Sequence, residues 1–188
     1  MKKRIIVAIT GATGIIYGIR LLEVLKGFDF ESHLILSDAA KKNILIETEF
    51  SIDYVEGLAY KSHDVDNLAA SISSGSFKTY GMVIAPCTVK TLSGIANSYN
   101  DNLIVRAADV VLKEKRRLVL VIRETPLHKG HLELMARVAD VGGIILPPVP
   151  AFYHKPKGIG DIIDHTVGKI LDLMDIEHNL FKRWGGEQ

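Results

Sequence analysis

The stretch IVAITGATGIIYGIRLLEVL, residues 5–24, passes from a short apolar run through a glycine turn into apolar residues at helical spacing. A short run rich in Val and Ile is typical of a strand that is buried on both faces of a parallel sheet. The turn that follows contains Gly11 and Gly14. Backbone N–H groups at the start of a helix after such a turn favour an anion. The stretch therefore predicts the first strand and helix of an α/β domain.

The rest of the chain repeats this alternation. Further strands are predicted at 32–36, 82–85, 118–122 and 143–146, after a first one at 4–9. Amphipathic segments predict helices at 13–26, 38–47, 88–98, 101–115, 127–141 and 159–174, whereas 51–79 has no clear periodicity. Alternating strands and helices indicate βαβ units. We expect one domain, residues 1–188, with a three-layer, doubly wound parallel sheet of the Rossmann-like or flavodoxin-like type.

Composition excludes several classes of protein. The 188 residues are 47% hydrophobic and 24% charged, with a net charge of +1, which gives no overall attraction for nucleic acid or acidic membranes. The single cysteine, Cys87, cannot form an intrachain disulfide. The opening MKKRIIVAIT lacks the pattern of a signal peptide, and no apolar run is long enough to span a bilayer. We expect a cytoplasmic protein without nucleic-acid or membrane partners.

Polar residues follow four of the predicted strands. They occur in TGATG at 10–14, SDAAK at 37–41, APCTVKTLS at 85–93 and RETPLH at 123–128. The carboxyl ends of parallel strands meet at one edge of the sheet, where ligands bind. These segments together predict a site for one or two phosphate groups. The alternative for each of Thr13, Ser37 and Thr88 is that it only caps its helix, because Ser and Thr are preferred there in any protein.

The first turn does not match a dinucleotide-binding motif. Gly-x-Gly-x-x-Gly would need glycine at position 9, which is Ile9, and the short-chain dehydrogenase pattern would need it at Tyr17. Tyr153 and Lys157 imitate a Tyr-x-x-x-Lys pair, but Pro156 between them opposes a helix. The sequence therefore favours a mononucleotide over a nicotinamide dinucleotide.

The motifs combine into a resemblance over essentially the whole chain. GATG, SDAAKK, PCTVKTLSGIANSYNDNLIVRAADVVLKEKRRLVLVIRETPLH, ILPPVPAFYHKP and GKILD together resemble the UbiX-like flavin prenyltransferases, earlier described as small subunits of aromatic acid decarboxylases. The resemblance implies an enzyme that joins the dimethylallyl group of dimethylallyl monophosphate to N5 and C6 of reduced FMN. It also implies that the prenylated FMN serves a UbiD-like decarboxylase, and that the chain forms a homododecamer.

The resemblance also assigns roles to residues. The residues it implies for FMN binding are Gly11, Ala12, Thr13, Ser37, Thr88, Val89, Lys90, Thr91 and Arg123. Those implied for the prenyl phosphate are Tyr153 and Lys169, together with Arg123. The implied catalytic residues that line the same pocket are Thr13, Glu47, Arg106, Lys113, Glu124 and Trp184. The family usually has Ser where this chain has Thr13, so a role for that hydroxyl beyond binding is an open expectation.

These residue types suit the implied chemistry. Breaking an allylic carbon–oxygen bond leaves a phosphate anion, which Arg, Lys and Tyr side chains stabilise. The chain has no DDxxD motif, so we predict neutralisation by basic side chains and no metal; His128 and His131 lack a third ligand. Trp184 and Tyr153 offer aromatic faces to an allyl cation. Glu47 and Glu124 are candidates for moving protons.

Alternatives stay open for residues and for function. Trp184 could be a surface or oligomer aromatic, Glu47 and Glu124 could form only salt bridges, and Cys87 is expected to be a buried residue rather than a nucleophile. An FMN-dependent cysteine decarboxylase of the same fold typically has PASANT where this chain has PCTVKT. A non-catalytic flavin-carrier subunit is the other alternative. The apolar run GGIILPPVPAFY predicts a subunit contact, and the tail from about 176 is expected at an oligomer interface or the active site.

Overall fold

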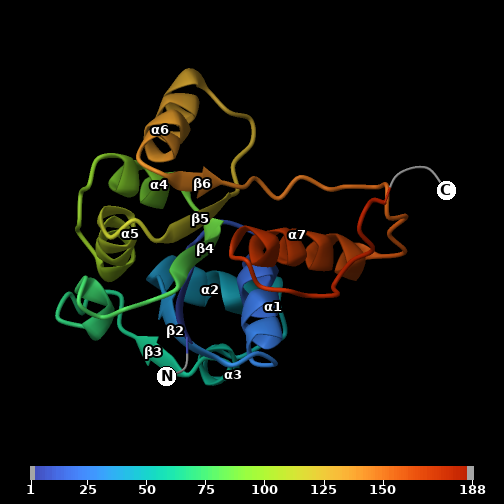
Figure 1. Ribbon diagram of the computed structural model, residues 1–188, viewed down its shortest axis with the longest axis horizontal. Coiled ribbons are helices and arrows are strands. Elements are labelled where there is room, and N and C mark those ends of the chain that lie inside the picture. Colours follow the sequence, from blue (N-terminus) through green and yellow to red (C-terminus); the bar gives the residue numbers. More distant parts are fainter. Residues whose placement is uncertain (1–2, 186–188) are drawn as a thin grey trace.

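The computed structural model describes residues 3–185, which form a six-stranded, wholly parallel sheet (Figure 1). The strands are β1 (Lys3–Ile9), β2 (Phe30–Leu36), β3 (Lys61–His63), β4 (Gly81–Cys87), β5 (Arg117–Ile122) and β6 (Gly143–Ile145). The five predicted strands are all present. The third strand was missed because it has only three residues, of which only His63 is buried.

The strand order is β3-β2-β1-β4-β5-β6. This is the order of the Rossmann fold, and the five strands other than the short edge strand β3 follow the flavodoxin order. The order reverses between β1 and β4, where Val7 lies beside Val83. Ligands of such sheets bind at this reversal, beyond the carboxyl ends of the strands. The fold prediction is confirmed, and it places the expected site between β1 and β4.

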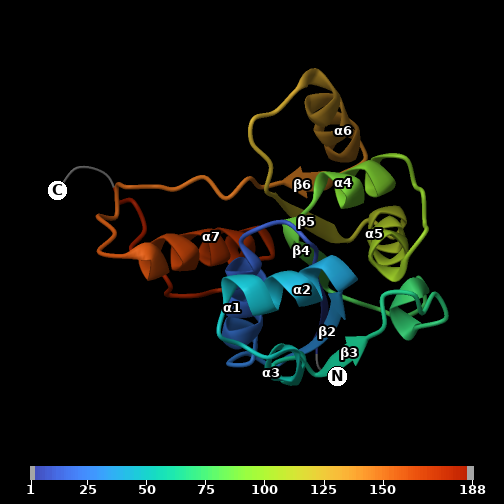
Figure 2. The same cartoon turned by 180° about the vertical axis from the view of Figure 1, so that it is seen from behind.

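Helices cover both faces of the sheet (Figures 1 and 2). One face carries α1 (Ile15–Leu25), α2 (Asp38–Glu47), α3 (Ile52–Gly57) and α7 (Ile159–Leu173). The other carries α4 (Val89–Ala96), α5 (Leu103–Lys113) and α6 (Lys129–Asp140), with a 3-10 turn, η1, at Ser71–Ser73. Along β1, Val7 packs on the first face and Ile6 on the second. Strands buried on both faces explain the continuous apolar runs in the sequence.

The C-terminal part extends away from the sheet. After β6 the chain runs outward as residues 147–158, here called the arm, and α7 returns toward the sheet (Figure 1). Arg20 on α1 pairs with Asp164 at 2.7 Å and holds α7 in place. Of the predicted tail from about 176, residues 186–188 lie outside the described residues. None of the helices within 3–185 has the length and apolarity needed to cross a membrane.

Candidate functional site

The ends of four strands are joined by hydrogen bonds that continue the sheet into the loops. The buried Thr10 hydroxyl, directly after β1, donates to the Pro86 carbonyl at 2.8 Å and accepts from the Thr88 N–H at 2.9 Å. Ser37 N–H donates to Ile9 O, and Arg123 N–H donates to Cys87 O. The four polar segments predicted from the sequence therefore meet at one edge. Thr10, which holds two of them together, was not singled out from the sequence.

Two helices begin at this edge with side-chain caps. Ser37 Oγ accepts the Ala40 N–H in α2, and Thr88 Oγ1 accepts the Thr91 N–H in α4. The two preceding N–H groups of each helix have no acceptor within the helix, because they belong to its first turn. Ser37 and Thr88 are thus helix caps, as the simpler interpretation predicted. The helices they cap still present free N–H groups and the positive ends of their dipoles to a ligand.

The first helix begins differently from the prediction. The predicted cap, Thr13, is exposed and makes none of the capping hydrogen bonds; α1 begins at Ile15, after Gly14 in a left-handed conformation with φ of 92°. Glu47 on α2 supplies the cap, since its Oε2 accepts the N–H groups of Gly14 at 2.8 Å and Ile15 at 3.2 Å. A protein carboxylate therefore occupies the anion position that the sequence assigned to a ligand at this turn.

One face of α2 shapes the glycine turn. Ala39, Asn43 and Glu47 are spaced four residues apart and lie on the same side of the helix. A Cβ on Gly11 would lie 2.3 Å from the Cβ of Ala39, so only glycine permits this approach. Asn43 Nδ2 donates to the Gly11 carbonyl at 3.0 Å. Asn43 was missed in the sequence, although its spacing from Glu47 was visible there.

A cavity of about 970 Å³ opens at this edge, beside the point where the strand order reverses. Its wall includes five of the residues predicted to bind FMN, namely Gly11, Ser37, Thr88, Lys90 and Thr91. Lys42 and Lys90 add positive charge, whereas Asp38, Asp66 and Asp101 add negative charge. The volume lies in the range that accepts a cofactor. Two capped helix N-termini and two lysines fit one phosphate group, so the cavity suits a mononucleotide such as FMN.

Part of the remaining wall comes from the segment between α4 and α5, which the sequence did not assign to the site. It contributes Asn97, Tyr99, Asp101 and Asn102, and Tyr99 is 69% exposed. An exposed aromatic ring beside a polar cavity is suited to stacking on a planar ligand. The polar run NSYND was visible in the sequence, but nothing local showed that it faces the strand ends.

Arg123 and Glu124 follow β5 directly, at the same edge. Both side chains are exposed, and Glu124 Oε1 accepts the N–H of Thr125 at 3.0 Å. Val89 lines a second cavity of about 460 Å³ between α4 and α6, with Lys90, His128 and His131. Ala12 and Thr13 lie on the turn itself. Eight of the nine predicted flavin residues therefore lie in the walls of two neighbouring cavities or on the turn, and Arg123 lies at the same edge, just after β5.

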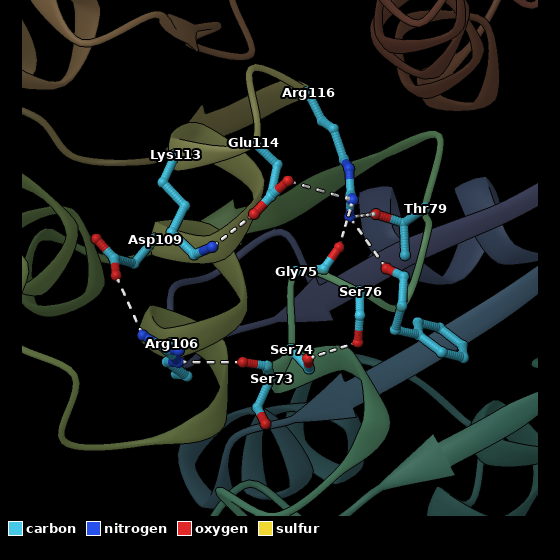
Figure 3. A network of polar contacts seen from close by, with 11 residues as sticks. Ser73, Ser74, Gly75, Ser76, Thr79, Arg106, Asp109, Lys113, Glu114 and Arg116 are labelled. Atoms are coloured by element: carbon cyan, nitrogen blue, oxygen red, sulfur yellow. Dashed lines mark hydrogen bonds and ion pairs between the residues drawn. The ribbon is translucent and has the colours of Figure 1, made fainter.

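Arg106 and Lys113 lie on α5, in a polar network with the loop before β4 (Figure 3), and neither is among the residues that line the cavity. Arg106 Nε donates to Ser73 O at 3.1 Å, and Lys113 Nζ pairs with Glu114 at 2.5 Å. The neighbouring Arg116 donates to the carbonyls of Gly75 and Phe77. Arg106 on α5 and Arg116 just after it therefore hold the loop 73–79, whereas Lys113 pairs with Glu114 at the end of the helix.

Tyr153, Lys169 and Trp184 form a third group, on the arm, α7 and the tail. The ring centroids of Tyr153 and Trp184 are 6.0 Å apart, with planes at 79°, an edge-to-face contact. Lys169 Nζ lies 3.7 Å from Asp172, which also accepts hydrogen bonds from Arg183 at 2.6 and 3.1 Å. This cluster fastens the tail to α7. Within one chain, the arm and α5 lie at opposite ends of the long axis (Figure 1).

Two further predictions concern residues with simpler roles. Cys87 is fully buried, and burial raises the pKa of its thiol, as expected for a structural residue. His128 caps α6, and its ring centroid is 3.5 Å from that of His131. Within residues 3–185, no three His, Cys, Asp or Glu side chains are grouped as metal ligands would be.

Comparison with known proteins places the whole chain in one family. Residues 1–183 match the Flavoprotein family. The chain is 56% identical over 187 residues to the flavin prenyltransferase UbiX of Escherichia coli K12, which covers 98% of this chain and 99% of that one. It is 50% identical over 182 residues to the flavin prenyltransferase UbiX of Archaeoglobus fulgidus, covering 97% of this chain and 100% of the relative.

Solved structures agree with these relatives. AnUbiX (PadA1), in complex with FMN and dimethylallyl pyrophosphate, superposes with a TM-score of 0.98 at 47% identity and full coverage of both chains. A dodecameric FMN-dependent UbiX-like decarboxylase from Escherichia coli O157:H7 gives 0.95 at 48% identity, covering 97% of this chain and 100% of the other. The peptidyl-cysteine decarboxylase EpiD, with a TM-score of 0.65 over 93% of this chain and 99% of its own, is 14% identical and shares the fold alone. The chain therefore belongs to the Flavoprotein family and, within it, to the UbiX flavin prenyltransferases.

Proposed function

We propose that this chain transfers the dimethylallyl group of dimethylallyl monophosphate to N5 and C6 of reduced FMN, forming prenylated FMN. The observation that carries the proposal is the cavity at the strand reversal, with the capped starts of α2 and α4 and Lys90 in its wall. Free N–H groups at helix starts bind phosphate. AnUbiX, with which this chain shares its fold and about half its sequence, is known with FMN and dimethylallyl pyrophosphate.

The transfer sets three requirements for the side chains. Reduced FMN supplies the electron-rich ring atoms to which the allyl group is joined. The bond between the allyl carbon and the phosphate oxygen breaks, and phosphate leaves with the electron pair, so Tyr153, Lys169 and Arg123 are proposed to bind it. The aromatic pair Tyr153 and Trp184 shields and stabilises the allyl cation. The bond to N5 replaces the allyl–oxygen bond, and the bond to C6 forms from the π electrons of the prenyl alkene, whose other carbon gains a proton. Glu47 and Glu124, the remaining carboxylates of the predicted site, are proposed to accept the protons lost from N5 and C6 and to return one of them to that alkene carbon, which leaves a net gain of C5H8.

A single chain does not bring all the predicted site residues together. Arg106 and Lys113 on α5 lie at the end of the molecule opposite the arm that carries Tyr153 (Figure 1). We infer that neighbouring copies contribute residues to each site, in a homododecamer like the relative from Escherichia coli O157:H7. The exposed Val149 and Phe152, 70% and 69% exposed, support a subunit contact at the arm. We also propose that the chain forms one domain and that its tail, from about residue 176, packs at this subunit contact.

The product is proposed to serve a UbiD-like decarboxylase as its cofactor. The cytoplasmic location stays a prediction. A cysteine decarboxylase is the second candidate by fold, but the PCTVKT segment at the start of α4 differs from the PASANT typical of that group, and the likeness to EpiD is one of fold alone. A flavin carrier would need no second phosphate site with Tyr153 and Lys169.

The test is to incubate the protein with reduced FMN and dimethylallyl monophosphate without oxygen, and then to weigh the flavin by mass spectrometry. We expect a gain of one C5H8 unit, which requires the protein and is absent when dimethylallyl alcohol replaces the phosphate. A flavin of unchanged mass would contradict the proposal. Parallel assays for CO2 release from a cysteine peptide and for NADH oxidation distinguish the alternatives.

A further inference from the structure

Tyr153 does not stand alone on the arm. Its hydroxyl oxygen lies 2.9 Å from Nε2 of His165 on α7, within hydrogen-bond distance. His165 is only 7% exposed, whereas Tyr153 is 45% exposed. The phenol therefore faces solvent on one side and a buried imidazole on the other. Family resemblance assigned no role to His165, and the sequence offered no signal for it.

The surroundings of His165 hold its ring in one orientation. The ring of His154 stacks on it with planes at 4° and centroids 4.9 Å apart, and Phe181 of the tail lies at 4.6 Å. Burial lowers the pKa of His165 below its ordinary 6.5, and the nearby His154 and Lys169 lower it further, with Asp172 opposing. The imidazole is consequently neutral at pH 7, with a hydrogen on one nitrogen only.

The direction of the hydrogen bond decides what Tyr153 can do. A phenol has one hydrogen to donate. If that hydrogen were directed to Nε2 of His165, only lone pairs would face a bound phosphate, and oxygen lone pairs repel a phosphate. If Nε2 carries the hydrogen instead, the phenol oxygen accepts it, and the Tyr153 hydrogen is free for the phosphate. An O–H donated to a charged oxygen makes a stronger bond than one between neutral groups.

We propose that His165 is a positioning residue, which donates its Nε2–H to Tyr153 and thereby directs the Tyr153 hydroxyl hydrogen toward the phosphate of the prenyl substrate. The proposal rests on the proposed function, in which Tyr153 binds that phosphate. Lys169 lies one turn after His165 on α7 and supplies the positive charge. Lys169 thus supplies positive charge to the phosphate, and His165 orients the hydrogen that Tyr153 donates to it.

Two polar substitutions of His165 separate this role from packing. In His165→Gln the amide nitrogen reaches the position of Nε2 and still donates, whereas in His165→Asn it falls at the position of Nδ1 and cannot reach Tyr153. We expect KM for dimethylallyl monophosphate to rise about tenfold in His165→Asn, the effect of losing one hydrogen bond to a charged group. The His165→Gln variant should stay within about threefold of the unsubstituted protein. The affinity for FMN, measured by quenching of flavin fluorescence, should be the same in both variants.

A double-mutant cycle with Tyr153→Phe completes the test. Because His165 acts through the phenol, His165→Asn should have no further effect on KM once the hydroxyl is absent. Equal KM values in the Asn and Gln variants, or a full additional loss in the double variant, would overturn the proposal. Thermal unfolding of each variant shows whether the fold is kept. Both the Gln and the Asn variant lose the imidazole, so a difference in KM between them does not come from the loss of ring packing. If the unsubstituted protein forms no prenylated FMN, the proposed function itself fails and this inference fails with it.

Discussion

The carboxylate of Glu47 lies 2.8 Å from the backbone nitrogen of Gly14, across the gap between α2 and the start of α1. Glu47 therefore neutralises the positive end of the α1 dipole. The starts of α2 and α4 carry hydroxyl caps, which have no charge, and remain open to an anion. The three neighbouring helices therefore differ at their starts: the α1 dipole already has a carboxylate partner, whereas the capped starts of α2 and α4 line the cavity, with Asp38 as a negative charge in the first turn of α2.

Replacing Glu47 tests this capping role. Glu47→Ala removes the acceptor of two N–H groups, and we expect the free energy of unfolding in urea to fall by about 1 kcal/mol. Glu47→Gln keeps an acceptor oxygen without the charge and should lose less than half of that. If Glu47 also accepts a proton in the reaction, Glu47→Gln will lose kcat while nearly keeping its stability. Equal stability of the Ala variant and the unsubstituted protein would contradict the capping role.

The contact of Gly11 with Ala39 predicts a suppressor pair. Gly11→Ala brings two Cβ atoms to 2.3 Å, so α2 must shift, and we expect a loss of about 1–3 kcal/mol in stability together with weaker FMN binding. Ala39→Gly in the same chain removes one of the two Cβ atoms and should restore part of the FMN affinity.

The control for this pair is Gly160→Ala, because a Cβ on Gly160 of α7 meets nothing within 4 Å. That variant should match or exceed the original stability. FMN affinity is measured by fluorescence quenching. Failure of Ala39→Gly to improve the Gly11→Ala variant would show that the contact is not what excludes a side chain at Gly11.

A buried histidine pair predicts how stability depends on pH. Nδ1 of His33 lies 2.9 Å from Nε2 of His63, and burial, followed by the charges of His63 and Arg4, lowers the pKa of His33 to about 4 from 6.5. Between these values the unfolded chain binds the proton and the folded chain does not. Stability should therefore be greatest above pH 6.5 and fall as the pH is lowered toward 4, by up to about 3 kcal/mol from His33.

Urea unfolding at pH 7 and pH 4.5 measures this dependence. The double variant His33→Leu/His63→Leu removes both titrating groups, so its stability should change less between the two pH values. An equal change in the variant and the unsubstituted protein would assign the acid sensitivity to other groups.

Because Lys113 and Tyr153 lie far apart in one chain, we expect that two inactive variants, each lacking one of these residues, restore activity when they assemble together. Lys113→Ala on α5 and Tyr153→Phe on the arm should each reduce prenylation of FMN strongly. Oligomers that contain both variants, obtained by co-expression with two different tags, should regain activity, because some sites receive an unsubstituted residue from each chain. Mixed oligomers no more active than the single variants would place both residues in the same chain's site. Mixing two preparations of Lys113→Ala is the matched control.

Much of the fold was readable from local patterns. Strands buried on both faces appear as continuous Val and Ile runs, and the Ser37 and Thr88 caps mark helix starts whatever surrounds them. The edge strand β3 could not be recognised in the sequence, because it has three residues and only His63 is buried, which leaves no apolar run. The start of α1 was misplaced by two residues because its cap comes from Glu47, more than thirty positions away in the sequence.

What the sequence by itself determined is the parallel sheet, the gathering of polar turns at one of its edges and, through motif resemblance, the family. These follow from periodicity and short-range capping, which depend on neighbouring residues. Only the tertiary structure decided that Glu47 occupies the α1 terminus, that Asn43 binds Gly11, that His165 lies beneath Tyr153, and that α5 and the arm are far apart in one chain. Each of these joins residues distant in sequence, and their proximity arises only when whole helices pack on the sheet.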